Sequence, residues 1–306
     1  MRILVLRLSA LGDIIHTIPA VSLLRPVAGV AWVVEDPYAE LVEIVAGVTP
    51  IPVRLKRWSR APAAWRGEAR AAIRRMRGFD AAVDFQGLLK SGLLAWLSRA
   101  PVRFGFDAAA VREKPALLFT NRHVTVDRSR HVVDWNRELA EAVTSNRQPA
   151  EERWRDFPAD PQGKVERFAG RVVLLPGAGK RDKQWPVENY RALVQRYRDR
   201  TVVAWGPGER GLAEAIGGEV APETNLRELA ALLRGAAAVI GGDTGPLHLA
   251  AAMGTKAVGL YGPTDPLRNG PYGQIASTVN HFRGRGRSME SIGVDEVIAR
   301  MEEVLG

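Results

Sequence analysis

The stretch MRILVLRLSALGDIIHTIPA at residues 1–20 contains a short apolar run, a break that ends in a glycine, and then a helical pattern. The apolar run 3–6 predicts a buried strand, and apolar residues spaced three to four apart predict a helix from Asp13 to Leu24. Strand, loop and helix in this order form the repeating unit of a parallel sheet with crossover helices. Because Arg7 and Asp13 interrupt the apolar stretch and no small-residue cleavage site follows, we interpret it as a mature cytoplasmic start and not as a signal peptide.

The same unit recurs through the first half of the chain. Further strands are predicted at 30–34, 81–85 and 101–104, with helices at 88–97 and 131–143. The polar, proline-bearing stretch TSNRQPAEERWRDFPADPQGK, which begins at residue 144, is interpreted as a linker. The expected domains are residues 1–150 and 151–306.

The second half restarts the pattern. RVVLLPGAG (171–179) and TVVAWGPGE (201–209) each predict a strand with a glycine loop, and WPVENYRALVQRY (185–197) predicts a helix with Pro186 in its first turn. AAAVIGGDTGPLHLAAAMG (236–254) predicts a buried strand that runs into a helix opened by Asp243 and Thr244, and KAVGLYGPTDP (256–266) predicts the final strand and loop. Two similar α/β halves are therefore expected, with the ligand at the carboxyl ends of the strands, in a cleft between the domains.

Composition excludes several classes of protein. The 306 residues are 46% hydrophobic, 25% charged and 7% aromatic, which is typical of a soluble globular protein and favours two domains or one large one. Cysteine is absent, which rules out a disulfide framework, a thiolate metal site and a cysteine nucleophile. No apolar run approaches the ~18 residues that a membrane span needs, so we expect any membrane association to be peripheral.

The net charge of +9 is concentrated in one segment. Residues 54–77, called the basic segment below, contain nine basic residues and a single acidic one, Glu68. We expect a loop at 53–60, followed by a helix at 66–77 whose arginines recur at helical spacing. The segment suggests a polyanionic partner, and for 66–77 a solvated helix packed on the sheet is the simpler interpretation. Nucleic acid is the second candidate partner, but neither stacking aromatics nor a nucleic-acid motif accompanies the charge, so an anionic lipid or a phosphorylated saccharide fits better.

Two glycine loops at strand ends are candidate phosphate sites. GDTGPLH (242–248) places backbone N–H groups at a helix start, where a pyrophosphate is favoured, although an ordinary helix cap explains the motif equally well. PGAGKRDKQWP (176–186) combines glycines with basic side chains, and its simpler interpretation is a solvated turn. Asp13 follows Gly12 at the first strand, where a carboxylate either caps the helix or accepts a proton.

Several catalytic motifs are missing from the sequence. It contains no Asp-x-Asp pair, Gly-x-Ser-x-Gly elbow, Walker A loop or His-Glu-x-x-His helix. Metal-chelating nucleotide-sugar sites, hydrolases and kinases therefore lose support.

The motifs together resemble a known family. MRILVLRLSALGDIIHTIPA, WVVED, VRLKRWSR, FDAAVDFQGLLKSGLLA, REKPALLFTNRH, KQWP, GGDTGPLHLAAA and YGPTDP occur in this order along nearly the whole chain. They are similar to the ADP-heptose:lipopolysaccharide heptosyltransferases of glycosyltransferase family 9, and KRWSR, DFQGLLKS and LFTNRH are most similar to heptosyltransferase I. The resemblance implies a GT-B fold of two Rossmann-like domains and an inverting transfer of heptose from ADP-heptose to the Kdo of the lipopolysaccharide inner core. It also implies that the C-terminal domain binds the donor.

The resemblance implies roles for individual residues. Asp13 falls on the proposed general base and Lys183 on the proposed phosphate ligand, and these two form the expected catalytic set. The expected donor-binding residues are Gly177, Lys183, Asp243, Thr244, Gly245 and His248. The expected acceptor-binding residues are Ser9, Gly12, Lys56, Arg57 and Arg60.

The resemblance also implies that no cofactor or metal ion is needed, and we expect neither a nucleic acid nor a stable protein as partner. The expected partners are ADP-heptose and Kdo-lipid A, or a heptosylated core acceptor, at the inner face of the inner membrane, where the cytoplasmic protein would be peripheral. The sequence allows the last helix to pack back on the N-terminal domain.

Two departures from the family pattern leave undecided whether the acceptor is that of the first heptose or of a later one. Relatives that add the first heptose often carry hydroxyl residues where this chain has Gly177, Ala178 and Gly179, and they usually have lysine at the position of Arg60. The first departure resembles enzymes that add a later heptose, so a heptosyltransferase II-like activity is a second possibility. A non-catalytic nucleotide-sugar binding protein and a nucleic-acid-binding protein that uses the basic segment are also compatible with the sequence.

Overall fold

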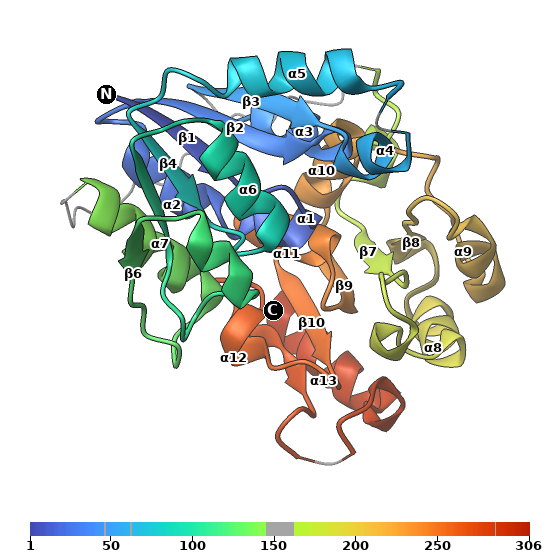
Figure 1. Ribbon diagram of the computed structural model, residues 1–306. Helices are drawn as coiled ribbons and strands as arrows, with labels where there is room; N and C mark the ends of the chain where they lie inside the picture. The colour runs from blue at the N-terminus through green and yellow to red at the C-terminus, as the bar shows by residue number, and fades with distance from the viewer. Residues whose placement is uncertain (46, 62, 145–161, 285) are drawn as a thin grey trace. The chain divides into compact units, whose positions relative to one another are not determined.

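The computed structural model describes residues 1–306 except 46, 62, 145–161 and 285 (Figure 1). The chain divides into two compact units, Met1–Asp156 and Phe157–Gly306. The predicted domain boundary at 150/151, and nearly all of the predicted linker, lie outside the described residues.

The first unit is built on a six-stranded parallel sheet. Its strands are β1 (Arg2–Leu6), β2 (Gly29–Glu35), β3 (Val48–Val53), β4 (Ala81–Asp84), β5 (Val102–Phe106) and β6 (Arg122–Val124). They are arranged in the order β3-β2-β1-β4-β5-β6, so the direction of the strand order reverses between β1 and β4. This is the doubly wound arrangement that the repeating strand–helix pattern predicts, and ligands bind at such a reversal.

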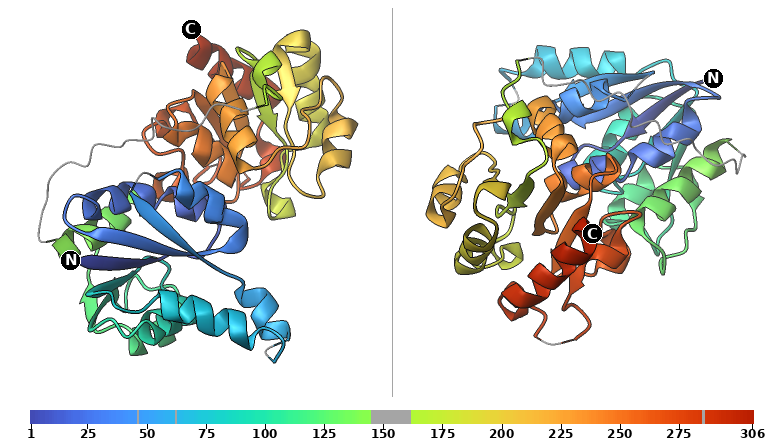
Figure 2. Two further views of the ribbon diagram at one scale, coloured as in Figure 1. Left: turned by 90° about the horizontal axis from the view of Figure 1, so that it is seen from above. Right: turned by 180° about the vertical axis from the view of Figure 1, so that it is seen from behind.

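Helices cover both faces of this sheet (Figure 2). They are α1 (Leu11–Ile15), α2 (Ile18–Leu24), α3 (Ala39–Glu43), α4 (Leu55–Arg60), α5 (Arg66–Arg75), α6 (Leu89–Leu97) and α7 (Val132–Thr144), with 3-10 turns η1 (Asp36–Tyr38) and η2 (Lys114–Leu118). Ala72 of α5 and Leu94 and Ala95 of α6 join one core cluster with alternate residues of the strands, such as Leu4 and Leu6. The helices α5 and α6 therefore lie on the same face of the sheet.

The predicted first helix is divided into two. α1 ends at Ile15 and α2 starts at Ile18, with Pro19 in its first turn. In one continuous helix Pro19 would lack the N–H that bonds to the carbonyl of Ile15, and its ring would clash with that carbonyl. At the start of α2 the missing N–H costs nothing, which explains the break.

Two elements of the first unit differ from the sequence prediction. Strand β3 was not predicted, because Pro50 and Pro52 argue against a strand; its place at the edge of the sheet resolves the conflict, since only one side of an edge strand needs ladder donors. The loop predicted at 53–60 is wrong, because Leu55–Arg60 forms helix α4. The predicted arginine helix is confirmed as α5, with Ala72 buried and its arginines exposed.

The second unit contains a five-stranded parallel sheet. Its strands are β7 (Val172–Leu175), β8 (Thr201–Val203), β9 (Ala238–Gly242), β10 (Ala257–Tyr261) and β11 (Val279–Asn280). Their order is β11-β10-β9-β7-β8, and the strand order reverses between β7 and β9. The prediction that the strand in 256–266 is the last one is wrong, because the two-residue β11 follows it.

The helices of the second unit are α8 (Val187–Tyr197), α9 (Arg210–Ile216), α10 (Leu226–Gly235), α11 (Gly245–Ala252), α12 (Pro266–Asn269) and α13 (Val294–Leu305). The 3-10 turns are η3 (Glu166–Phe168), η4 (Arg181–Lys183), η5 (Arg198–Arg200), η6 (Ile275–Ser277) and η7 (Met289–Ser291). Pro186 is the N-cap of α8 and not a first-turn residue. The last helix, α13, belongs to the second unit, where Val297 and Met301 join the core cluster of its sheet.

Candidate active site

In the second unit, two loops meet at the strand-order reversal. β7 and β9 are neighbours, with Leu175 opposite Gly241, so the loops that follow them leave the sheet side by side. Gly242, at the end of β9, lies under the backbone of η4: a Cβ at this position would be 2.6 Å from the carbonyl oxygen of Lys183. Only glycine lets η4 approach the strand so closely, and this approach brings Lys183 to Asp243.

Asp243 is the centre of a polar cluster. Its Oδ2 lies 2.5 Å from Nζ of Lys183 and its Oδ1 lies 3.1 Å from Nε2 of His248, while Nδ2 of Asn269 donates to both oxygens at 3.0 Å. The Asp243 side chain is only 6% exposed. Burial alone would raise its pKa, but the hydrogen bonds and charges of His248 and Lys183 outweigh it and lower the pKa of Asp243 to about 2. The carboxylate therefore stays ionised and holds the lysine in place.

The start of α11 lies directly beside this cluster. Thr244 is the N-cap, Gly245 opens the helix, and a proline follows in the first turn. The hydroxyl oxygen of Thr244 is buried and has no hydrogen-bond partner among the residues that the structure describes. Unsatisfied N–H groups at a helix start attract an anion, and the lysine next to them adds positive charge. The predicted donor residues Lys183, Asp243, Thr244, Gly245 and His248 thus come together.

Two residues that the sequence analysis missed belong to the same edge. Asn269 comes from α12, after β10, and Glu209 comes from the loop after β8. A Cβ on Gly177 would overlap the carboxylate of Glu209, which also accepts a hydrogen bond from the N–H of Gly206 at 2.9 Å. The available signal was that they follow β10 and β8, the strands beside β9 and β7, because the carboxyl ends of parallel strands meet at one edge.

In the first unit, Asp13 lies between two arginines. Its Oδ1 is 2.8 Å from Nη2 of Arg7 and its Oδ2 is 3.4 Å from Nη1 of Arg112. Arg7 is 3% exposed and also donates to the carbonyl oxygen of Phe85, at the end of β4. Burial lowers the pKa of Arg7, whereas the negative charge of Asp13 acts in the opposite direction. Asp13 itself is partly open, with 32% of its side chain exposed.

A second buried network supports the loop that carries Asp13. Gln86 accepts a hydrogen bond from the N–H of Leu8 at 2.6 Å and donates to the carbonyl oxygen of Ser9 at 3.2 Å. Asp84 in turn accepts from the N–H of Gln86 at 2.9 Å and from the hydroxyl of Ser91 at 2.9 Å. Burial raises the pKa of Asp84 to about 6 despite these donors. The residues that follow β4 thus fix the backbone of Ser9 through the hydrogen bond from Gln86.

The expected acceptor residues fall into two groups. Ser9 and Gly12 lie beside Asp13, at the end of β1 and in α1. Lys56, Arg57 and Arg60 lie on α4 and are exposed, and the guanidinium of Arg57 stacks on the ring of Trp65 at 3.5 Å. The two arginines that pair with Asp13 are Arg7 and Arg112, so the structure does not bring the α4 group to the Asp13 carboxylate.

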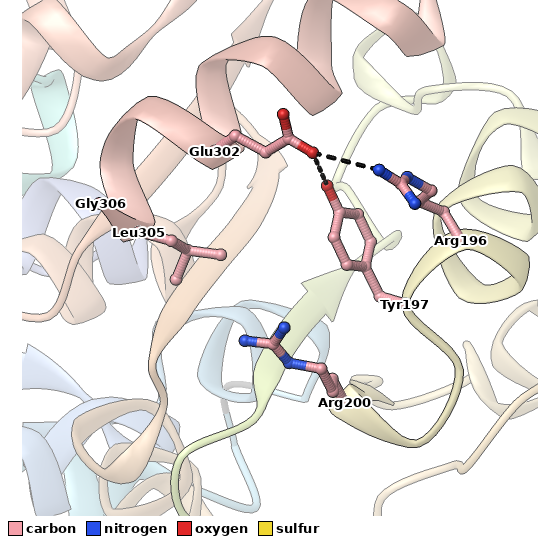
Figure 3. A pocket seen from close by; sticks show the side chains of 6 residues that line it. All are labelled: Arg196, Tyr197, Arg200, Glu302, Leu305 and Gly306. Atoms are coloured by element: carbon pink, nitrogen blue, oxygen red, sulfur yellow. Dashed lines mark hydrogen bonds and ion pairs between the residues drawn. The ribbon is translucent and has the colours of Figure 1, made fainter.

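A separate hollow of about 420 Å³ in the second unit is lined by Arg196, Tyr197, Arg200, Glu302, Leu305 and Gly306 (Figure 3). Tyr197 donates to Glu302 at 3.4 Å, and Arg196 pairs with the same carboxylate at 3.5 Å. Arg200 directly precedes β8, so the hollow lies at the amino edge of the sheet, where this fold does not place its ligand.

The described part of the chain shows neither a metal centre nor a membrane span. Outside the gaps named above, no group of three His, Asp or Glu side chains is placed to hold a metal ion. Over the same residues, no helix has the length and apolar character needed to cross a membrane.

Comparison with known proteins identifies the family. The profile of glycosyltransferase family 9 (heptosyltransferase) matches residues 69–290. Lipopolysaccharide heptosyltransferase 1 of Pseudomonas aeruginosa is 35% identical over 300 residues, a match that covers 90% of this chain and 82% of that protein.

Two solved structures of E. coli heptosyltransferase WaaC are 31% identical to this chain and cover 99% of it. The complex with ADP has a TM-score of 0.85 and is covered over 100% of its length. The complex with ADP-2-deoxy-2-fluoro heptose has a TM-score of 0.82 and is covered over 99%. The expected GT-B fold of two parallel-sheet domains is thereby confirmed, and the chain belongs to glycosyltransferase family 9, the heptosyltransferases.

Proposed function

We propose that this glycosyltransferase moves heptose from ADP-heptose to the Kdo of the lipopolysaccharide inner core, with inversion at the anomeric carbon. The observation that carries the proposal is the cluster of Lys183, Asp243 and Thr244 at the start of α11. The similarity to WaaC, solved with ADP and with a fluorinated ADP-heptose, supports the donor. A relative named heptosyltransferase 1 supports addition of the first heptose over the heptosyltransferase II-like activity.

The diphosphate of the donor would bind at the start of α11. The N–H groups there, the Thr244 hydroxyl and the Lys183 ammonium supply donors and positive charge. The ion pair with Asp243 would keep the Lys183 ammonium aimed at the diphosphate. Glu209 lies after β8, where Rossmann-like units place the acidic residue that accepts hydrogen bonds from ribose hydroxyls, so it would orient the nucleoside.

Bond breaking places new negative charge on the departing ADP. The acceptor hydroxyl oxygen attacks the anomeric carbon, the bond from that carbon to the phosphate oxygen breaks, and ADP leaves with the electron pair. Lys183 and the α11 start would stabilise this charge electrostatically. We propose that this arrangement removes the need for a metal ion, so transfer should persist in excess chelator; loss of activity in EDTA, restored by a divalent cation, would contradict this part of the proposal.

Asp13 would accept the proton of the attacking hydroxyl. A carboxylate cannot deprotonate a sugar alcohol in advance, so the proton moves late, when the new bond has acidified the hydroxyl. Arg7 holds one carboxylate oxygen of Asp13 at 2.8 Å and Arg112 approaches the other at 3.4 Å, which fixes the direction of the carboxylate. Ser9 and Gly12, beside Asp13, would contact the acceptor sugar.

The acceptor is anionic and lipid-borne, and we propose that Lys56, Arg57 and Arg60 contact its carboxylates and phosphates. Their exposure on α4 leaves them accessible to such a partner. The protein would act at the inner face of the inner membrane, from the cytoplasmic side, without a nucleic acid or a stable protein partner.

The test replaces Asp13 with Asn and measures transfer from ADP-heptose to Kdo-lipid A. We expect kcat to fall by about 10²–10⁴-fold, because general-base assistance is lost, while ADP affinity is kept. Asp80→Asn is the matched control, since Asp80 is exposed at the amino edge of the same sheet, where it accepts from the N–H of Arg2. Near-parental turnover of Asp13→Asn would reject this base. A parent protein that binds ADP-heptose but transfers nothing would instead favour a non-catalytic binding protein.

A further inference from the structure

Helix α6 carries apolar side chains on two opposite faces. Leu94 and Ala95 point into the core that α6 shares with α5 and the sheet. Leu89, Leu93 and Trp96 follow each other at spacings of four and three residues and are 45%, 39% and 53% exposed. Such spacing places them in one stripe along the helix, on its solvent side. A soluble helix with one buried face normally presents polar residues there, so the stripe needs a separate explanation.

The neighbouring turn η2 enlarges this stripe. Gly92 lies against η2 so closely that a Cβ would be 3.1 Å from the carbonyl oxygen of Ala116, and the rings of Trp96 and Phe119 meet edge to face at 6.5 Å. Leu118 of η2 is 82% exposed, the largest exposed fraction of the large apolar residues in the described part of the chain. We call Leu89, Leu93, Trp96 and Leu118 together the apolar patch.

Exposed basic residues flank the members of the apolar patch along the chain. Lys90, Arg99 and Lys114 are exposed and stand within four residues of its members in the chain. The acidic neighbour, Glu113, accepts a hydrogen bond from the N–H of Leu89 at 2.7 Å at the start of α6. Helix α5 lies on the same face of the sheet as α6 and carries exposed arginines, so cationic and apolar side chains share one side of the first unit.

The start of α6, where the apolar patch begins, lies near the ion pair of Asp13 and Arg112. α6 follows β4 after a short turn, and the N–H of Glu113 donates to the carbonyl oxygen of Gly87 in that turn at 2.9 Å. The residue before Glu113 is Arg112, which pairs with Asp13. A partner that binds the apolar patch would therefore also lie near Asp13, the proposed base that receives the proton of the acceptor hydroxyl.

We propose that the apolar patch and its cationic surroundings dock the protein on an anionic lipid bilayer. Apolar side chains would enter the boundary of the acyl chains while lysines and arginines bind the lipid headgroups. The biological role of this docking rests on the proposed function: the base Asp13, beside a docking surface, can reach a sugar that is attached to a membrane lipid. A second copy of the chain is a poorer partner, because its cationic surroundings would be brought against identical charges.

The test measures sedimentation of the full-length protein with vesicles of phosphatidylcholine, with or without phosphatidylglycerol. We expect the parent to bind the anionic vesicles, and the variant Leu93→Ser/Trp96→Ser/Leu118→Ser to bind them roughly tenfold or more weakly, because each side chain loses apolar burial. Val27→Ser is the matched control: Val27 is 42% exposed but lies two residues before β2, at the amino end of the sheet, whereas α6 follows the carboxyl end of β4. Circular dichroism and thermal unfolding verify that the triple variant is folded.

Three outcomes separate the possibilities. Equal vesicle binding by parent and triple variant overturns the inference. A parent that is dimeric in analytical ultracentrifugation, with a monomeric triple variant and unchanged vesicle binding, overturns it in favour of a second copy. Vesicle binding that depends on the patch supports it, even if the parent transfers no heptose, in which case only the proposed function fails. If transfer is observed, the variant should retain it with a detergent-dispersed acceptor and lose it with a vesicle-embedded one.

Discussion

Replacing Asp243 with Asn should destabilise the second unit in a manner that depends on pH. The Asp243 pKa of about 2 is roughly two pH units below the ordinary value of 3.8, and each unit corresponds to about 1.4 kcal/mol. The ionised carboxylate therefore contributes roughly 2–3 kcal/mol to folding at neutral pH. Asn has one acceptor oxygen where Asp243 has two, and its amide would face the Lys183 ammonium or the Asn269 amide.

The sign of the pH dependence follows from the lowered pKa. The contribution of Asp243 is complete above the unfolded-state pKa, near pH 4, and is lost as the pH falls toward 2 and the folded protein takes up the proton. Asp243→Asn lacks this contribution at every pH. The difference in stability between parent and variant should thus shrink as the pH falls below about 4.

Differential scanning calorimetry of the two proteins across this pH range is the assay. A loss of roughly 2–3 kcal/mol should lower the unfolding temperature of a unit of this size by roughly 5–10 °C at pH 7. Asp182→Asn is the control, because it removes the same charge from an exposed position beside Lys183. Equal unfolding temperatures at pH 7, or a difference that stays constant down to about pH 3, would refute the reasoning.

Three further predictions follow from the site. Lys183→Met should weaken ADP binding by about 10–100-fold in titration calorimetry, since a charge-assisted hydrogen bond contributes about 1.5–3 kcal/mol; unchanged affinity would remove Lys183 from the phosphate site. Gly242→Ala should lower both stability and ADP affinity, because its Cβ would force η4 and Lys183 off the end of β9, and parental values for both would contradict that account. Replacing Lys56, Arg57 and Arg60 together with Ser should raise the KM for the acceptor and leave ADP affinity unchanged; an unaltered acceptor KM would exclude α4 from the acceptor site.

Most strands and the longer helices could be predicted, because short apolar runs at regular intervals define a parallel sheet. The errors occurred where tertiary position overrides local preference. Pro50 and Pro52 conceal an edge strand, and Pro19 lies in the first turn of a second helix within an apparently continuous pattern. Most of the charge-rich segment 53–60 folds as a helix and not as a loop.

The candidate site was predictable where its residues share one motif. Asp243, Thr244 and His248 lie within six residues, so the sequence alone places them together at the start of a helix. Arg7, by contrast, stands in the sequence only as an interruption of an apolar stretch. Its partner Phe85 is 78 residues away, so only the pairing of β1 with β4 brings the guanidinium and the carbonyl together. Asn269 and Glu209 were missed for the same reason.

The prolines of β3 also affect how the protein behaves in a crowded solution. In an edge strand every second residue directs its N–H and C=O away from the sheet. Of these residues in β3, Pro50 and Pro52 have no N–H, and the N–H of Val48 donates to the carbonyl oxygen of Val45 at 3.1 Å. Arg75 of α5 donates to the outward carbonyl oxygen of Pro50 at 3.0 Å. A strand of another molecule that approached β3 would find no N–H at the prolines to accept from, and the carbonyl oxygen of Pro50 already accepts a hydrogen bond. These features oppose edge-to-edge aggregation at β3.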